Sequence, residues 1–293
     1  MTAAHPRASL LALAALVAGA LAMGISPVFV RLAEVGPYTS AFYRVFLALP
    51  LLWAWARQEA RSRPDQPEPG WSRAELLAGL FFSADLFFWH LAIFNTTIAN
   101  ATFLATLAPV WVALFSGLFI GEPVTRRVLG GLAICILGGS FLIGSSYSLA
   151  PERLVGDFYG VMTSVFFGLY FLAVRVARRD GRPGLIVFRS TLMTSAVLFV
   201  VALAMENAWL PMTFAGVAAL VAMAAISHVG GQGLLAYALG HLSAAFSALV
   251  IFLEALFAAG LGLVVFGEAI TPLQLLGGAA ILAGIWIARP REG

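Results

Sequence analysis

The chain has 293 residues, of which 61% are hydrophobic and 11% are charged, and its formal net charge is +3. Soluble domains contain about 45–50% apolar and about 25% charged residues. A composition this apolar excludes an ordinary globular enzyme, a nucleic-acid-binding protein and a disordered chain. The single cysteine, Cys135, excludes an internal disulfide.

Long apolar runs follow one another along the chain. A helix that crosses the hydrocarbon core of a bilayer needs about 20 mostly apolar residues. Ten runs approach that length: 9–31, 39–56, 74–94, 98–119, 128–146, 157–177, 184–205, 213–238, 243–266 and 272–288. They are continuous rather than alternating, which argues against a membrane β-barrel. We therefore expect an all-α integral membrane protein with ten transmembrane helices.

The arginines predict how these helices are oriented. All 17 Lys+Arg residues are arginine, and they cluster near the ends of the apolar runs. With a cytoplasmic N-terminus, fourteen of the 17 fall on or near the inner side, and Arg31, Arg44 and Arg153 fall on the outer side. This bias follows the positive-inside rule. We expect a multi-pass protein of the cell inner (plasma) membrane with both termini in the cytoplasm.

One short motif occurs twice in the chain. Gly121-Glu122 is followed, after seven residues, by Gly130-Gly131. Gly267-Glu268 is followed, after eight residues, by Gly277-Gly278. Recurrence of this kind predicts an internal duplication.

Other residues align at nearly the same offset: Arg31 with Arg175, Arg44 with Arg189, and 92–95 with 238–241. The repeats then cover 9–146 and 157–288. Each holds five spans, an odd number, so the two halves face opposite ways across the membrane. Inverted repeats are typical of secondary transporters, in which a central site opens to each side in turn. A duplication without a transport role is the alternative.

The doubled Gly-Glu turn with its downstream glycine pair resembles the EamA repeat of the drug/metabolite transporter superfamily, as does Pro109 in the fourth run. Within that superfamily the chain looks most similar to the YddG-type amino-acid exporters. The resemblance implies ten helices with a central cavity lined by spans 1, 3, 4, 6, 8 and 9, and with spans 5 and 10 set aside. The second half departs from the pattern, because Ala255 stands where Pro109 would match.

Ionisable side chains inside apolar runs are functional candidates, because burying them in a membrane is costly. Glu254 lies in the middle of the ninth run, at the position that corresponds to Ala108. Its carboxyl group could carry a proton or contact a substrate amine. The alternative is a neutral, hydrogen-bonded structural glutamate.

Asp85, in the third run, lies one helical turn before Trp89, and His90 follows. An acid beside an aromatic ring suits an ammonium group on a hydrophobic molecule. The alternative for Asp85 is a carboxylate that caps a buried arginine or a helix end. His90 alone is more typical of a satisfied interfacial histidine.

Five more side chains complete the predicted site. His228 and Gln232 are four residues apart in the eighth run, among glycines that allow local unwinding. Tyr170 in the sixth run matches Ser26 in the first, and the Ser26-Pro27 pair can free backbone groups for a ligand. We predict a substrate cavity formed by Glu254, Asp85, Trp89, His90, His228, Gln232, Tyr170, Ser26 and Phe246.

The remaining charged residues are expected to have structural roles. Arg31, Arg44, Arg175 and Arg189 could bind a substrate carboxylate, but arginines near span ends more often reach the membrane interface and fix topology. Glu122 and Glu268 are expected to hold helix ends or to pair with arginine. No His, Cys, Asp or Glu residues have metal-ligand spacing, so we expect no metal and no cofactor.

These observations favour a secondary transporter that exports amino acids, aromatic and neutral ones included, and related metabolites, or facilitates their diffusion, by alternating access. Proton-coupled export of cationic drugs is a second hypothesis. An intramembrane enzyme or sensor is a third hypothesis. The absence of a catalytic motif from the sequence argues against it. We expect a monomer in the lipid bilayer that binds a small-molecule substrate but no nucleic acid; protons are a further candidate partner.

Overall fold

The computed structural model describes residues 6–64, 68–143, 151–257, 260 and 271–290. These residues form helices and connecting turns and contain no strand. In chain order the helices are α1 (Pro6–Gly24), α2 (Ser26–Leu32), α3 (Pro37–Phe46), α4 (Leu49–Arg61), α5 (Arg73–Asn95), α6 (Ile98–Ala105), α7 (Ala108–Phe115), η1 (Ser116–Ile120), α8 (Arg126–Ile143), η3 (Pro151–Arg153), α9 (Leu154–Ala177), α10 (Pro183–Met205), α11 (Phe214–Ala222), η4 (Met223–Gln232), α12 (Gly233–Ala238), α13 (Ala244–Val250) and α15 (Pro272–Ala288).

Six helical stretches of the described residues are long and apolar enough to cross a membrane. They are Leu10–Leu32, Arg73–Asn95, Ile98–Ile120, Pro151–Ala177, Pro183–Met205 and Phe214–Ala238. The other four expected spans, 39–56, 128–146, 243–266 and 272–288, coincide with shorter helices, and part of 243–266 lies outside the described residues. The all-helical membrane fold is confirmed, whereas the number ten stays a prediction.

Several spans are interrupted near their middle. α7 begins after a turn at Thr106 and Leu107, and Pro109 occupies its first turn. Proline has no N–H to donate and clashes with the preceding turn, so it begins a helix more readily than it continues one. The ninth span is interrupted as well, at Ile251, although Ala255 replaces the proline there. This interruption lies one turn before Glu254.

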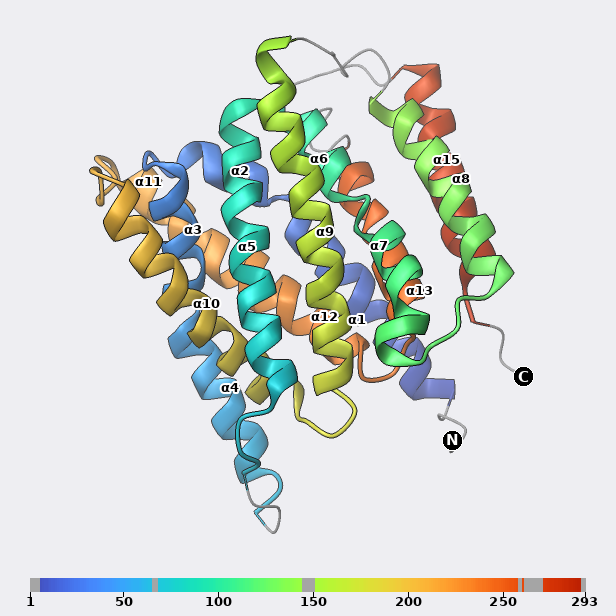
Figure 1. Cartoon of the computed structure of the whole chain (residues 1–293), viewed down its shortest axis with the longest axis horizontal. Coiled ribbons are helices and arrows are strands. Elements are labelled where there is room, and N and C mark those ends of the chain that lie inside the picture. Colours follow the sequence, from blue (N-terminus) through green and yellow to red (C-terminus); the bar gives the residue numbers. More distant parts are fainter. Residues whose placement is uncertain (1–5, 65–67, 144–150, 258–259, 261–270, 291–293) are drawn as a thin grey trace.

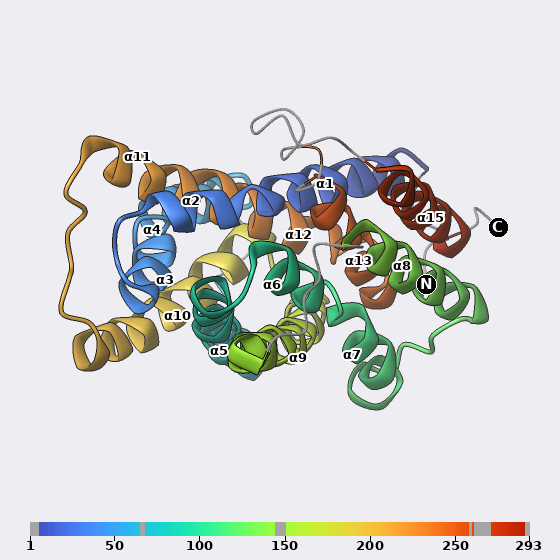
Figure 2. The ribbon, with the colours of Figure 1, turned by 90° about the horizontal axis from the view of Figure 1, so that it is seen from above.

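The helices form a central group with one pair beside it. α5 and α9 run side by side in opposite directions through the middle of the molecule (Figure 1). α8 and α15 lie against each other at one end of the view from above (Figure 2). A Cβ atom added at Gly138 would lie 2.7 Å from the carbonyl oxygen of Gly277, so small residues allow this pair to approach closely.

One contact occurs in both halves of the chain. Nη2 of Arg31 donates to the carbonyl oxygen of Ile93, and Nη1 of Arg175 donates to that of Leu239, each over 2.6 Å. Figure 1 places the end of α2 toward the top and the end of α9 toward the bottom, so the two contacts lie at opposite ends. An inverted repeat requires this arrangement; the boundaries 9–146 and 157–288 stay a prediction.

α1 begins and α15 ends at the same end of the molecule (Figure 1). An even number of membrane crossings gives this result. The side of the membrane that this end faces stays a prediction, and with it the cytoplasmic location of both termini.

Candidate functional site

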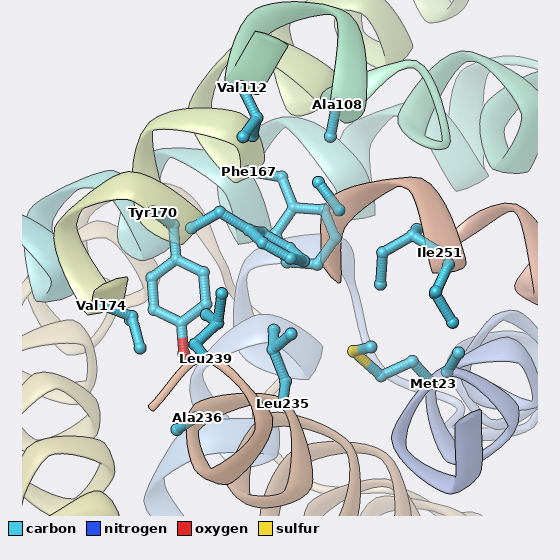
Figure 3. Packing of buried hydrophobic residues seen from close by; sticks show 14 of the residues in the cluster. Met23, Ala108, Val112, Phe167, Tyr170, Val174, Leu235, Ala236, Leu239 and Ile251 are labelled. Carbon is cyan, nitrogen blue, oxygen red and sulfur yellow. The ribbon is translucent and has the colours of Figure 1, made fainter. Parts of the chain in front are cut away.

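A small cavity lies at the centre of the bundle, where α1 and α2, α3, α5, α6, α9, η4 and the end of α13 meet. Its polar lining consists of Ser26, Arg44, Asp85, Thr163, Gln232 and Glu254; its apolar lining consists of Met23, Leu86, Trp89, Ala105, Phe167 and Ile251. Figure 3 shows Met23, Phe167 and Ile251 turned toward one another from three different segments. The cavity therefore draws on spans 1, 3, 4, 6, 8 and 9, and on span 2 through Arg44.

The cavity is too small for a metabolite in this conformation. Its free volume is about 40 Å³, and a single buried water needs roughly 10–15 Å³. Ligand pockets usually measure about 300–1,000 Å³. A metabolite can therefore enter only after the surrounding helices move apart.

Three ionisable side chains of both signs meet in this cavity. Arg44 is 4% exposed and Asp85 is 5% exposed. Arg44 is attracted electrostatically by Asp85 and by Glu254. In the part of the chain that the structure describes, Arg44 nevertheless forms no ion pair within 4.0 Å. The charges share one site without neutralising one another in direct contact.

Several buried polar atoms around the cavity lack a hydrogen-bond partner among the described residues. They are Ser26 Oγ, Arg44 Nε, Thr163 Oγ1, Gln232 Oε1 and Glu254 Oε1. More than about nine-tenths of buried polar groups in proteins are hydrogen-bonded, so such a group of exceptions needs an explanation. Ordered water fits the cavity and can satisfy these atoms in this conformation, and a polar substrate would use the same donors and acceptors after the helices move apart.

Trp89 forms one wall of the charged part of the cavity. The Cζ atom of Arg44 lies 5.3 Å from the centre of the Trp89 ring. A guanidinium group over an indole face gains about 0.5–2 kcal/mol from cation–π attraction. Trp89 therefore helps to hold Arg44 in place and presents an aromatic surface to the cavity.

Five of the nine site residues predicted from the sequence line this cavity: Glu254, Asp85, Trp89, Gln232 and Ser26. The other four lie outside its lining. His90 Nδ1 is 2.8 Å from the carbonyl oxygen of Leu86, and Phe246 is 1% exposed within the hydrophobic core. Tyr170 packs against Phe82, with 4.6 Å between the ring centres.

His228 is the fourth residue outside the lining. Its Nε2 atom is 2.9 Å from Thr191 Oγ1, and its ring stacks near Phe82. The prediction assumed that His228 and Gln232 share one face of an α-helix. The segment Met223–Gln232 is instead a π-helix. Of the two residues, Gln232 lines the cavity and His228 does not.

Arg44 is the charged cavity residue that the predicted site left out. Its place near a span end favoured a role at the membrane interface, and the structure overturns that role, because the side chain is buried between Asp85 and Trp89. A signal was present, however. Asp85 and Glu254 were two intramembrane acids without an assigned countercharge, and such acids usually face a basic group.

The other arginines of the sequence prediction have structural partners. Nε of Arg175 lies 2.6 Å from Oε1 of Glu122, whose Oε2 accepts a hydrogen bond from the N–H of Ala244 over 3.1 Å. Arg189, 6% exposed, lies 3.4 Å from Glu75. The expected pairing of Glu122 with arginine is confirmed, and Glu268 lies outside the described residues.

Comparison with known proteins adds the family. The sequence model of the EamA-like transporter family matches residues 10–144 and again residues 154–289. The chain belongs to this family. It is therefore a multi-pass membrane transporter of the drug/metabolite transporter superfamily, and transport rather than catalysis is the activity that its relatives suggest.

Individual relatives agree with this assignment. An uncharacterised transporter of Archaeoglobus fulgidus is 28% identical over 94% of this chain and 95% of its own length. The pseudopaline exporter CntI of Pseudomonas aeruginosa is 28% identical over 86% of each chain. A crystal structure that is 20% identical superimposes with a TM-score of 0.76, covering 97% of this chain and 99% of the other, and supports the fold alone.

Proposed function

We propose that this transporter carries amino acids, aromatic and neutral ones included, and related metabolites out of the cell by alternating access. The observation that carries the proposal is the central cavity in which Arg44, Asp85 and Glu254 meet beside Trp89. An amino acid bears a carboxylate and an ammonium group on one carbon atom, so its binding site needs both signs of charge within a short distance.

Each group of the site has a counterpart on such a substrate. Arg44 can donate two parallel hydrogen bonds to a carboxylate, the geometry that a guanidinium group favours. Asp85 and Glu254 can accept the ammonium group. Leu86 and Phe167 give the substrate side chain an apolar surface.

Alternating access also has support in the fold. The Arg31 contact and the Arg175 contact fix the ends of equivalent helices on opposite sides of the bundle. The interruptions at Leu107 and Ile251 provide points at which equivalent helices can bend. With the cavity between the two halves, rocking of one half against the other would open one side at a time.

We further propose that the protein belongs to the YddG-type exporter subgroup and lies in the inner membrane with both termini in the cytoplasm. It would act as a monomer, and protons would take part in transport. The positive-inside bias supports the orientation. Two carboxyl groups facing one arginine support a role for protons, because ionisation of both leaves one uncompensated negative charge.

Export of cationic drugs coupled to protons is the second candidate. The excess of acids over bases in the cavity favours it. Arg44 opposes it, because a cationic drug gains nothing from a guanidinium group in its binding site. The two candidates therefore differ in whether transport depends on Arg44.

Transport by the purified full chain in liposomes tests the proposal. A panel of labelled amino acids, with pseudopaline and a lipophilic cation added, would be offered with and without an imposed pH gradient. Saturable uptake of several amino acids that compete with one another supports the proposal. Uptake of the lipophilic cation alone would replace it with the drug-export candidate.

A further inference from the structure

A second and larger hollow lies at the end of the bundle where α4, α9 and α12 end and α10 begins, the lower end in Figure 1. Its volume is about 640 Å³, which falls within the range of about 300–1,000 Å³ for ligand pockets. It shares no lining residue with the central cavity. We call it the basic pocket, because its lining includes Arg63, Arg178, Arg179 and Arg182.

The charge of the basic pocket favours an anion. Four arginines face two acids, Glu59 and Asp180. Across the described ranges, none of these four arginines forms a salt bridge. One oxygen of Glu59 accepts a hydrogen bond from the N–H of Leu185 in the first turn of α10, over 3.3 Å. Glu59 thus contacts the start of α10 and also attracts Arg178 electrostatically, which leaves the other three arginines facing Asp180 alone.

Backbone contacts hold two of the arginines in place. Nε of Arg178 donates to the carbonyl oxygen of Ala236 over 2.7 Å, and Nη1 donates to that of Gly181. Arg179 donates to the carbonyl oxygen of Ile120. Burial lowers the pKa of Arg178 from its ordinary value; Glu59 opposes this shift, and the nearby Arg175 and Arg63 add to it. A bound anion would offset both effects.

Arg182 gives the independent sign of a ligand. This side chain is 8% exposed, and its Nη1 atom has no hydrogen-bond partner in the residues that the structure describes. It lies directly before α10, whose positive dipole end also attracts anions. An unpartnered guanidinium nitrogen in a basic pocket is a donor that is ready for an acceptor oxygen.

Two aromatic residues in the lining are of the type that is enriched at the height of lipid headgroups. Trp55 and Tyr237 belong to its lining. A Cβ atom added at Gly184 or at Gly233 would lie 2.9 Å from the Trp55 ring, so the indole is wedged between α10 and α12. Amphipathic rings of this type are enriched where hydrocarbon meets headgroups.

We propose that the basic pocket binds a phosphate group, carried by an anionic phospholipid or by inorganic phosphate, through Arg182 and the neighbouring Arg63, Arg178 and Arg179. Phosphate oxygens accept paired hydrogen bonds from guanidinium groups, and basic pockets between membrane helices suit anionic headgroups. This site is separate from the proposed transport cavity, and its occupation stabilises the junction of α9 and α10.

Thermal unfolding of the purified full chain in neutral detergent tests the proposal. Short-chain phosphatidylglycerol, phosphatidylcholine and inorganic phosphate would be titrated separately, and the rise in Tm would give an apparent Kd. The variant Arg182→Gln is compared with Arg127→Gln, which removes the same charge from an exposed position in the first turn of α8. Arg63→Gln, at the exposed rim of the pocket, is the second test variant and replaces Arg182→Gln if that variant does not fold.

Wild-type protein is expected to respond saturably to phosphatidylglycerol or to inorganic phosphate, and not to phosphatidylcholine. Arg182→Gln should weaken the apparent Kd by about tenfold and Arg63→Gln by about threefold, with Arg127→Gln close to wild type. A response to phosphatidylglycerol alone identifies a lipid as the source; a response to inorganic phosphate at the same concentration identifies a free anion. No response to either, or equal weakening in Arg182→Gln and Arg127→Gln, would overturn the proposal.

Discussion

Arg44 and Arg189 occupy matching positions in the two halves of the chain, yet their surroundings differ. Arg189 lies 3.4 Å from Glu75 and 3.0 Å from Glu68, and it donates to two loop carbonyl groups. Arg44 faces the central cavity, and among the described residues its Nε atom has no partner. Duplication supplied the same residue twice, and only one copy retains donors for a ligand.

The largest effect is expected from Arg44→Gln. Removing the guanidinium group leaves Asp85 and Glu254 without a positive neighbour and a substrate carboxylate without a donor. Amino-acid uptake into liposomes should fall by about a hundredfold or more. Arg44→Lys keeps the charge but loses the paired hydrogen bonds, so its loss should be about tenfold.

The control for both Arg44 variants is their melting temperature and size-exclusion profile, which separate a transport defect from misfolding. Amino-acid uptake by Arg44→Gln at the wild-type rate would show that Arg44, like Arg189, is structural. The difference between the two halves would then disappear.

Neutralising the acids should have the next largest effect. Asp85→Asn and Glu254→Gln should each lower amino-acid uptake by roughly tenfold, because each removes a charged acceptor for the ammonium group. If the acids carry protons, the response of uptake to an imposed pH gradient should also flatten. The measurement is the initial uptake rate with and without that gradient. Unchanged transport in both variants would contradict a proton-coupled site.

Arg189→Gln should lower stability and leave transport nearly unchanged, the opposite of the effect expected for Arg44→Gln. Breaking one side of a buried ion pair costs about 3–5 kcal/mol of unfolding free energy, so the melting temperature should fall. Uptake at a temperature where the variant is folded should stay within about twofold of wild type.

The partner variant Glu75→Gln keeps the hydrogen bonds that cap α5, because glutamine can also fill this capping position. A double-mutant cycle of Arg189→Gln and Glu75→Gln should therefore show positive coupling in thermal stability. Additive losses would mean that the pair at 3.4 Å contributes little.

The smallest effect is expected from Trp89→Phe. A phenyl ring attracts a cation less strongly than an indole ring, by about 0.5–1 kcal/mol, so KM for amino acids should rise by about threefold. Trp89→Leu should raise KM further because it removes the aromatic face. A change in kcat alone, with KM unchanged, would place Trp89 in the conformational step rather than in substrate binding.

The sequence by itself determined the class of this protein. Continuous apolar runs cannot be hidden in a soluble core, and the doubled Gly-Glu motif predicted the repeats. Glu254 and Asp85 were recognisable because a charge inside an apolar run is costly. These features depend on composition and local spacing alone.

Only the tertiary structure decided which side chains meet. Helical spacing tells which residues share a face of one helix, but not which neighbouring helix that face contacts. The sequence therefore favoured an interfacial role for Arg44, whereas the structure places it in the cavity with Asp85 and Trp89. His228 and Gln232 are four residues apart in the π-helical segment, yet Gln232 lines the cavity whereas His228 lies 2.9 Å from Thr191 Oγ1. The cavity is a property of seven spans together, and no single span specifies it.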